Sequence, residues 1–263
     1  MKIGFYDSGF GGITILKEAL KHIKKTHFFY LADNLNVPYG NKKKEELNYI
    51  VSKNIELMIL NKCDIIVIAC NTATSAAIKE VRQKYKDVCI IGTEPAVKPA
   101  LEYSLNINGN NKVLVTATIH TLNGEKLNDL VKAYDANHLV KKQELSKLVE
   151  FAENGNYTKE DIIKYLKSVI NNKEEYSSIV LGCTHFPLFK NEIKEFFNND
   201  IQIFDSSNGV VKNILTKIDD DFKVVNNAKE NNKINDNNLN TLELYLTKES
   251  KKYRETFYNI LNK

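Results

Sequence analysis

Two cysteines occupy matching positions at the ends of apolar segments, and they are the residues of this sequence best placed for chemistry. Cys70 follows the apolar run at 65–69, and Cys183 follows the run at 179–182. Each run predicts a buried strand that ends at a thiol, followed by a polar turn and a helix. A helix N-terminus favours the thiolate form of a nearby cysteine. Two such thiols facing one pocket can act as acid and base, so the pattern predicts a proton-transfer enzyme.

A buried, chemically inert cysteine is the alternative interpretation. Cys63 and Cys89 fit it, because Cys63 ends a helical stretch and Cys89 lies inside an apolar run. Cys70 and Cys183 differ in that each leads into a polar turn in the same way, which packing alone does not require. The four cysteines lack CxxC spacing, which argues against a zinc ribbon and a disulfide framework. A metal module with Cys70, Cys183 and His185 as ligands stays open as a rival.

Length and composition are ordinary for a globular protein. The 263 residues suffice for two domains, and the net charge of +4 says little about partners. Lysine-rich stretches at 42–44 and 251–252 are typical of solvated helix faces, so we expect no nucleic-acid partner. No apolar run approaches the ~20 residues of a membrane span, and no targeting segment precedes the first strand. We expect a cytoplasmic protein with reduced thiols and no membrane partner.

The rest of the sequence alternates between apolar runs and helical patterns, which predicts largely parallel sheets with helices on both faces. Similar segments at 64–72 and 178–185 indicate two related halves, and breaks near 95 and 205 indicate hinges. We therefore predict an α/β fold with two similar doubly wound parallel-sheet domains, residues 1–95 with 206–263 and residues 96–205. Ligands bind outside the carboxyl ends of such strands, so we expect the active site in the cleft between the domains.

Individual elements follow from the same patterns. Strands are expected over 2–7, 27–32, 64–69, 88–92, 112–116, 177–182, 200–204 and 242–246. Helices are expected over 12–25, 43–62, 73–85, 95–105, 119–133, 158–171, 187–198, 207–218 and 248–262. The polar segment 106–111 is expected to be a loop, and the Asn-rich segment 226–240 an exposed connection.

A glycine-rich turn at 7–12 follows the first strand. It does not match the dinucleotide fingerprint, because position 14 is Thr where the third glycine should stand, and it lacks the Gly-Lys-Ser/Thr of a phosphate loop. Two interpretations stay open. Exposed backbone N–H groups in the turn would suit a carboxylate ligand, or the segment is a plain tight turn in which Asp7 or Ser8 caps the next helix.

Three further polar turns, at 38–40, 116–121 and 205–207, are expected at the same edge. Each alone is typical of a cap or a turn. Together they place small hydrogen-bonding groups and few cations around the crevice. This pattern favours a small zwitterionic substrate over a nucleotide.

Several of these segments together resemble glutamate racemase, and the resemblance runs almost end to end. It rests on Asp7-Ser8-Gly9 with Gly11-Gly12, Pro38-Tyr39-Gly40, Ala69-Cys70-Asn71-Thr72-Ala73, Gly92 with Glu94-Pro95, Leu148-Val149-Glu150 and the segment 181–188. The sequence departs from the family at Lys142-Gln143, where the family often carries Cys-Pro, and the segment 226–240 has no counterpart there.

The resemblance implies cofactor-independent interconversion of L- and D-glutamate, without pyridoxal phosphate or metal. It implies that Cys70 takes the α-proton of D-glutamate and Cys183 that of L-glutamate, assisted by Asp7, His185 and Glu150. It also implies a homodimer and a supply of D-glutamate for peptidoglycan. The substrate contacts that follow are Asp7, Ser8, Tyr39, Gly40, Asn71, Thr72, Thr118, Thr121, Thr184 and His185.

Alternatives to this function remain at the level of sequence. A racemase of aspartate or another amino acid would share both thiols and differ in the depth of its pocket. A nucleotide-dependent oxidoreductase would need the phosphate fingerprint that position 14 lacks. His185 also has a plain structural interpretation, a histidine whose hydrogen bonds are satisfied within a turn.

Overall fold

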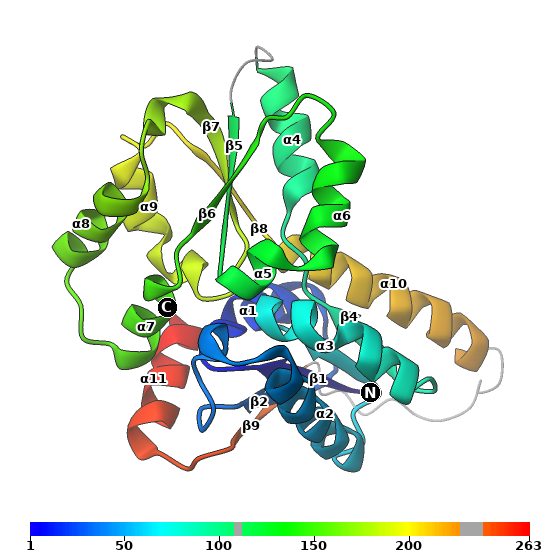
Figure 1. The fold of residues 1–263 in the computed structure, drawn as a ribbon. Helices are drawn as coiled ribbons and strands as arrows, with labels where there is room; N and C mark the ends of the chain where they lie inside the picture. The colour runs from blue at the N-terminus through cyan, green and yellow to red at the C-terminus, as the bar shows by residue number, and fades with distance from the viewer. Residues whose placement is uncertain (108–111, 227–238) are drawn as a thin grey trace.

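Two parallel β-sheets, each covered by helices on both faces, make up the structure (Figure 1). The computed structural model describes residues 1–107, 112–226 and 239–263. Every pair of neighbouring strands in either sheet runs parallel. The predicted fold of two parallel-sheet α/β domains is therefore confirmed.

The first sheet has the strand order β4-β3-β1-β2-β9. Its strands are β1 (Lys2–Asp7), β2 (His27–Ala32), β3 (Ile65–Ile68), β4 (Cys89–Gly92) and β9 (Thr241–Leu246). Helices α1 (Ile13–His22), α10 (Ser207–Asn226) and α11 (Lys251–Asn262) cover one face, and α2 (Lys44–Leu60) and α3 (Asn71–Lys84) the other. Because successive side chains of a strand point to opposite faces, Phe5 packs in the first of these cores and Tyr6 in the second.

The second sheet has the order β6-β5-β7-β8 and lies above the first in the view of Figure 1. Its strands are β5 (Lys112–Ala117), β6 (Val140–Glu144), β7 (Tyr176–Leu181) and β8 (Gln202–Asp205). Helices α4 (Val97–Asn106) and α6 (Glu125–Tyr134) pack on one face. Helices α7 (Lys147–Asn154), α8 (Lys159–Val169) and α9 (Lys190–Phe196) pack on the other. The short helix α5 (Ile119–Asn123) and three 3₁₀ turns, η1 (Tyr39–Asn41), η2 (Lys173–Glu175) and η3 (Phe186–Phe189), complete the described chain.

The first sheet is built from two distant parts of the sequence. It takes four strands from residues before 93 and its edge strand β9 from 241–246, while all strands of the second sheet lie between 112 and 205. The chain therefore crosses between the sheets twice, once between β4 and α4 and once between β8 and α10. The domain limits near 95 and 205 stay predictions.

The sequence patterns did not predict two of the elements, strand β6 and helix α7. Strand β6 lies at the sheet edge with Lys141, Lys142 and Glu144 exposed, so it shows no apolar run. Helix α7 follows it directly and was not expected.

The predicted helix 119–133 is two helices, because Gly124 is extended and the close approach of Ser75 leaves no room for a side chain there. In the predicted segments 106–111 and 226–240, residues 108–111 and 227–238 lie outside the described part of the chain.

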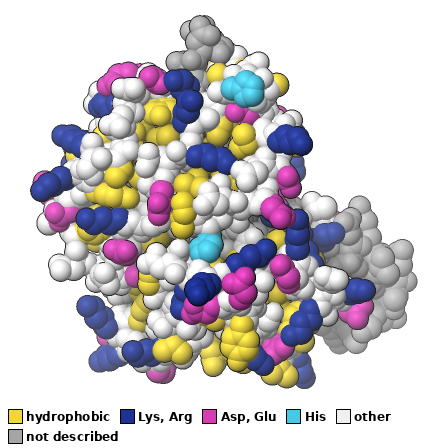
Figure 2. All heavy atoms as spheres, in the orientation of Figure 1, with side chains coloured by type: hydrophobic (Ala, Val, Ile, Leu, Met, Phe, Trp, Pro, Cys, Tyr) yellow, Lys and Arg dark blue, Asp and Glu magenta, His cyan; other side chains and the backbone are white. Residues whose placement is uncertain are grey.

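The molecular surface carries charges of both signs. On the face shown in Figure 2, basic and acidic side chains are interspersed, and several of them form ion pairs, such as Lys42 with Glu46 and Lys79 with Glu125. Within the described ranges, no helix is long and apolar enough to cross a membrane.

The carboxyl ends of the two sheets meet at the glycine-rich turn after β1. A Cβ atom on Gly9 would lie 1.9 Å from Glu153 Oε1. A Cβ atom on Gly11 would lie 2.5 Å from Thr184 Oγ1 and 2.7 Å from the backbone nitrogen of His185. These two glycines are therefore required by the contact between the sheets, which no side chain could enter without displacing the partner.

This contact predicts the effect of an alanine at position 11. We expect Gly11→Ala to lower the free energy of unfolding by about 1–3 kcal/mol, as overpacking of a close-packed interior does. The matched control is Gly209→Ala in α10, because a Cβ there meets nothing within 4 Å. Urea unfolding of both variants measures the difference, and equal stability of the two would contradict the contact described.

Candidate active site

Both candidate thiols border one small cavity between the two sheets. Cys70 comes from the end of β3 and Cys183 from the end of β7, and each is almost fully buried. The cavity has a volume of about 20 Å³. Most of the residues predicted for the site line it. Val149 also lines it, and so do Asn41 and Ser146, which the sequence did not single out. The predicted residues that line it are Ser8, Tyr39, Gly40, Cys70, Thr72, Thr118, Glu150, Cys183 and His185.

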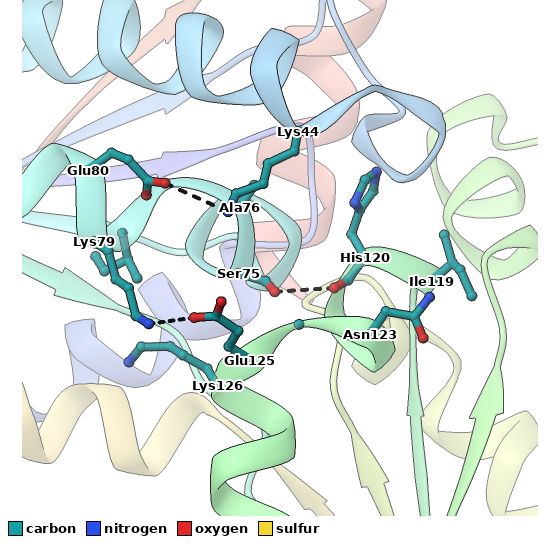
Figure 3. Close-up of a pocket in the computed structure, with 12 residues that line it drawn as sticks. Lys44, Ser75, Ala76, Lys79, Glu80, Ile119, His120, Asn123, Glu125 and Lys126 are labelled. Atoms are coloured by element: carbon teal, nitrogen blue, oxygen red, sulfur yellow. Dashed lines mark hydrogen bonds and ion pairs between the residues drawn. The ribbon is translucent and has the colours of Figure 1, made fainter.

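A larger cavity, about 370 Å³, lies between α3, α5 and α6 and is drawn in Figure 3. No cysteine lines it. Its charged side chains neutralise one another in pairs, since Lys79 bonds to Glu125 and Lys44 lies 3.7 Å from Glu80. The Ser75 hydroxyl donates to the His120 carbonyl. Because both candidate thiols border the smaller cavity and neither borders this one, the thiol chemistry is assigned to the smaller cavity.

Cys70 is the N-cap residue of α3. Its Sγ accepts a hydrogen bond from the Ala73 N–H at 3.5 Å and lies 3.6 Å from Ser8 Oγ. Burial and the nearby Asp7 carboxylate nevertheless raise the pKa of the Cys70 thiol to about 12. The helix N-terminus acts in the predicted direction, towards thiolate, but desolvation outweighs it. Cys70 is therefore a thiol in the resting site.

Cys183 is paired with a histidine. Its Sγ lies 3.7 Å from Nδ1 of His185, and Nε2 of the same ring lies 2.6 Å from Oε1 of Glu153. Burial alone would lower the pKa of His185, but its bonds to Cys183 and Glu153 outweigh that effect and raise the pKa well above its ordinary value. The imidazole therefore holds a proton between a thiol and a carboxylate.

Glu153 is the residue that sequence reasoning missed. Its Oε1 also accepts the Phe10 N–H at 2.9 Å, and its Oε2 accepts the Tyr253 hydroxyl at 2.9 Å. The sequence pointed to Glu150 instead, one turn earlier on the same helix, and Glu150 lies exposed at the edge of the cavity. A prediction of α7 as a helix would have offered both carboxylates as candidates, since residues three apart lie on neighbouring positions of one face.

Asp7 is fully buried behind the cavity. Its Oδ1 accepts the Gly9 N–H at 2.8 Å, and its Oδ2 accepts the Thr184 hydroxyl at 3.1 Å. No side chain caps α1, so the expectation that Asp7 or Ser8 would cap that helix is wrong. The turn does bind a carboxylate through a backbone N–H, but the carboxylate is the protein's own Glu153.

The remaining predicted substrate contacts differ in what they offer. Thr72 and Thr118 share a hydrogen bond of 2.9 Å across the two sheets, and Thr118 also reaches Thr121 at 3.4 Å. The Tyr39 hydroxyl is already engaged, since it bonds to Tyr6 and donates to the buried Asp33. Tyr39 therefore presents only its ring to the cavity.

Asn71 carries a polar atom with no assigned role. Its Nδ2 donates to the Thr93 carbonyl, while its Oδ1 is buried and accepts no hydrogen bond from the described residues. Buried carbonyl oxygens normally have a donor. Asn71 Oδ1 is thus a buried acceptor without a donor, on the residue that follows Cys70 in the chain, and Asn71 does not border the cavity.

The turn at 205–207 does not belong to this site, and that prediction is wrong. Asp205 accepts the Ser207 N–H at the start of α10, and the Ser206 hydroxyl donates to the Glu94 carbonyl at 2.8 Å. The bond from Ser206 to Glu94 joins the two segments that cross between the sheets. Within the described residues, no group of three or more His, Cys, Asp and Glu side chains is arranged to hold a metal ion.

The environment of Asp7 predicts a pH dependence of stability. Burial raises the pKa of Asp7 in the folded protein above its ordinary value near 4. The stability that Asp7 contributes is therefore fully present below that ordinary pKa and is lost as pH rises through the folded-state pKa. Asp7→Asn can keep the bond from the Gly9 N–H to its oxygen, and its amide nitrogen can donate to the Thr184 hydroxyl in place of the bond that Asp7 accepts, without the charge. We expect this variant to be at least as stable as the wild type at neutral pH, with a smaller loss of stability from acid to neutral pH.

Asp161 provides a control in which the pH dependence of stability has the opposite sign. Bonds from Thr158 lower the pKa of the exposed Asp161, so its contribution is present above its ordinary pKa and is lost as pH falls. Asp161→Asn should therefore lose stability at neutral pH. Urea unfolding at several pH values measures both variants, and a marked loss of stability in Asp7→Asn at neutral pH would refute the argument.

Comparison with known proteins identifies the family of the chain. The family model described as Asp/Glu/Hydantoin racemase matches residues 15–213. The glutamate racemase of Campylobacter curvus is 42% identical over 224 residues, 83% of each chain. Glutamate racemase 2 of Bacillus subtilis is 44% identical over 216 residues, 81% of this chain and 80% of that one.

Solved structures extend the likeness to the fold. Glutamate racemase from Aquifex pyrophilus superposes with a TM-score of 0.69 at 28% identity, covering 100% of this chain and 96% of that one. The Francisella tularensis enzyme, solved in complex with D-glutamate, gives 0.79 at 23% identity, covering 100% and 94%. The family model and the close relatives both span most of the sequence. The chain therefore belongs to the Asp/Glu/Hydantoin racemase family.

Proposed function

We propose that the protein is a glutamate racemase that moves the α-proton between two thiols, Cys70 and Cys183. The observation that carries the proposal is that these two thiols come from different sheets and border the same cavity. Racemisation removes the α-proton from one face of Cα and returns a proton to the other face. One thiolate and one thiol on opposite sides supply both functions and exchange roles when the direction reverses.

The surroundings of Cys183 support its role as base towards L-glutamate. When its proton has left, the thiolate faces His185, which Glu153 holds in its protonated form. An imidazolium in this position can donate a hydrogen bond to the sulfur that has given up its proton. In this proposal His185 and Glu153 are the assistants on this side of the substrate, and Glu153 takes the part that the sequence had assigned to Glu150.

In this mechanism, Cys70 is activated by a positive charge that the substrate brings. Its high pKa means that a positive charge has to arrive before the thiolate becomes accessible. The α-ammonium group of an amino acid brings that charge, and Asn71 Oδ1 offers a buried acceptor for it beside Cys70. Asp7 adds a carboxylate behind the same turn. Bound substrate would thus activate the thiol that abstracts its proton.

Entry of the substrate requires the two sheets to move apart. The cavity volume of about 20 Å³ is little more than the roughly 10–15 Å³ that one water molecule needs on the same measure, which leaves no room for glutamate. We infer that the cleft opens to bind substrate and closes to exclude water from the carbanion. The hydrogen bond between Thr72 and Thr118 spans this cleft and would break on opening.

The rival functions are less well supported. A dinucleotide would need free backbone N–H groups in the turn after β1, but the Phe10 N–H is bound to Glu153. An aspartate racemase would use the same thiols. The close relatives named as glutamate racemases favour glutamate, and parallel assays of both substrates decide the question.

Three wider expectations accompany this function. We propose a role in supplying D-glutamate for peptidoglycan, which is the usual role of the family. We propose a homodimer, which sedimentation analysis tests. We also propose a cytoplasmic location, because Cys70 and Cys183 form no disulfide and need a reducing compartment to remain thiols.

The thiol pair predicts a loss of activity in single-cysteine variants. We expect Cys70→Ser and Cys183→Ser each to lower kcat for glutamate racemisation by about 10²–10⁴-fold, the usual contribution of a positioned acid or base. Circular dichroism follows the loss of optical activity of L-glutamate in deuterated water, and mass spectrometry follows deuterium uptake at Cα.

Cys89→Ala serves as the control, because Cys89 does not border the cavity, and this variant should retain wild-type turnover. Absence of deuterium exchange in the wild-type protein would exclude a racemase. Racemisation at a near wild-type rate in either serine variant would exclude the two-thiol mechanism.

A further inference from the structure

The carboxylate of Glu153 is held by groups from three separate elements. Oε1 accepts from His185 Nε2 at 2.6 Å and from the Phe10 N–H at 2.9 Å. Oε2 accepts from the hydroxyl of Tyr253, at 2.9 Å. Tyr253 lies on α11, 100 residues away in sequence from Glu153, and it does not border the cavity. The proposed mechanism gives it no part.

Tyr253 is itself fixed in place. It lies in the first turn of α11, where its N–H donates to the N-cap Ser250 Oγ at 3.2 Å. Its ring stacks on Phe10 with centroids 3.8 Å apart and planes inclined by 14°. Burial and the adjacent Glu153 carboxylate raise the pKa of Tyr253 far above its ordinary range. The hydroxyl therefore stays protonated and acts as a donor to Glu153.

We propose that Tyr253 is a positioning residue of the racemase, whose hydroxyl fixes the Glu153 carboxylate and through it the His185 imidazole beside Cys183. This inference rests on the proposed function of Cys183 as an acid and base. The chain of contacts runs from Tyr253 to Glu153 Oε2, from Glu153 Oε1 to His185 Nε2, and from His185 Nδ1 to Cys183 Sγ.

The hydroxyl of Tyr253 orients the Glu153 carboxylate, which the ring of Tyr253 does not do. The terminal torsion of a glutamate is broad, so two anchored oxygens determine its plane better than one. Hydrogen bonds to a charged group are among the stronger ones, and a partly buried carboxylate oxygen without a donor is unfavourable. Loss of the hydroxyl would therefore loosen Glu153 and weaken its hold on the proton of His185, whereas the stack on Phe10 would remain.

The test is Tyr253→Phe, which deletes only the hydroxyl. We expect kcat for glutamate to fall about tenfold, as loss of a hydrogen bond to a charged group implies, with KM changed less than about twofold because Tyr253 does not touch the substrate. The matched control is Tyr258→Phe on the same helix. Tyr258 packs against Phe257 and does not border the cavity, so this variant should keep wild-type kinetics.

A double-mutant cycle separates positioning from a merely structural role. If Tyr253 acts through Glu153, its substitution should add little in a Glu153→Ala background, because the group it positions is gone. If Tyr253 only stabilises α11, the two effects should multiply. Multiplicative effects, or an unchanged kcat in Tyr253→Phe, would overturn the proposal.

Alkylation of the thiols provides a readout that does not depend on turnover. Iodoacetamide modification near neutral pH, with mass spectrometry of the Cys70 and Cys183 peptides, reports how readily each thiolate forms. We expect Tyr253→Phe to slow modification of Cys183 several-fold, by the same loss of charge stabilisation, and to leave Cys70 unchanged. An equal change at both cysteines would indicate general loosening and contradict the proposal. A wild-type protein that racemised no amino acid would refute the proposed function, while this comparison would still test the link from Tyr253 to Cys183.

Discussion

A negative charge at Glu153 has to be compensated at the place where the two sheets meet. A partly buried carboxylate is unfavourable unless donors surround it. Here the donors come from the turn after β1, from His185 and from the C-terminal helix. Each of these elements must therefore stay in its observed position for the carboxylate to be stable. The glycines of the turn are a direct result, since a side chain at Gly9 would occupy the place of Glu153 Oε1.

In the proposed mechanism the two thiols are activated by different means, although the two substrates are mirror images of each other. L- and D-glutamate have equal free energies in solution, so neither direction is favoured overall. Cys183 has an imidazolium held beside it by the fold, whereas Cys70 lies near the negative Asp7 and a hydroxyl. In the proposed mechanism, the positive charge that the fold does not supply beside Cys70 comes from the ammonium group of the substrate. The ammonium group is therefore as much a part of the catalytic arrangement as His185 is.

Local sequence patterns predicted most of the scaffold and the central pair of the site. Buried parallel strands are continuous apolar runs, so the strands that carry Cys70 and Cys183 were recognisable, and so were the turns that follow them. Strand β6 was not, because an edge strand with exposed lysines has no such signal. The helix that follows it was missed with it.

Glu153 could not be found in this way for a different reason. Its three partners lie 143, 32 and 100 residues away, and nothing in the residues around Glu153 reflects those contacts. A carboxylate one turn from Glu150 is ordinary on an exposed helix. Glu153 becomes a partly buried acceptor only because three distant segments of the chain approach it. The same holds for Asp205, whose position after a strand suggested the cleft but whose carboxylate caps α10.

The double crossing of the chain between the sheets constrains how the cleft can open. The segments between β4 and α4 and between β8 and α10 are joined by the bond from Ser206 to the Glu94 carbonyl, so the proposed opening of the cleft would turn about both segments together. Two bodies connected in this way can rotate about these segments but cannot separate freely. In the proposed opening of the cleft, Cys70 and Cys183 would move away from the substrate and towards it in a single motion. In the proposed mechanism, proton removal and proton return are therefore both confined to the closed state.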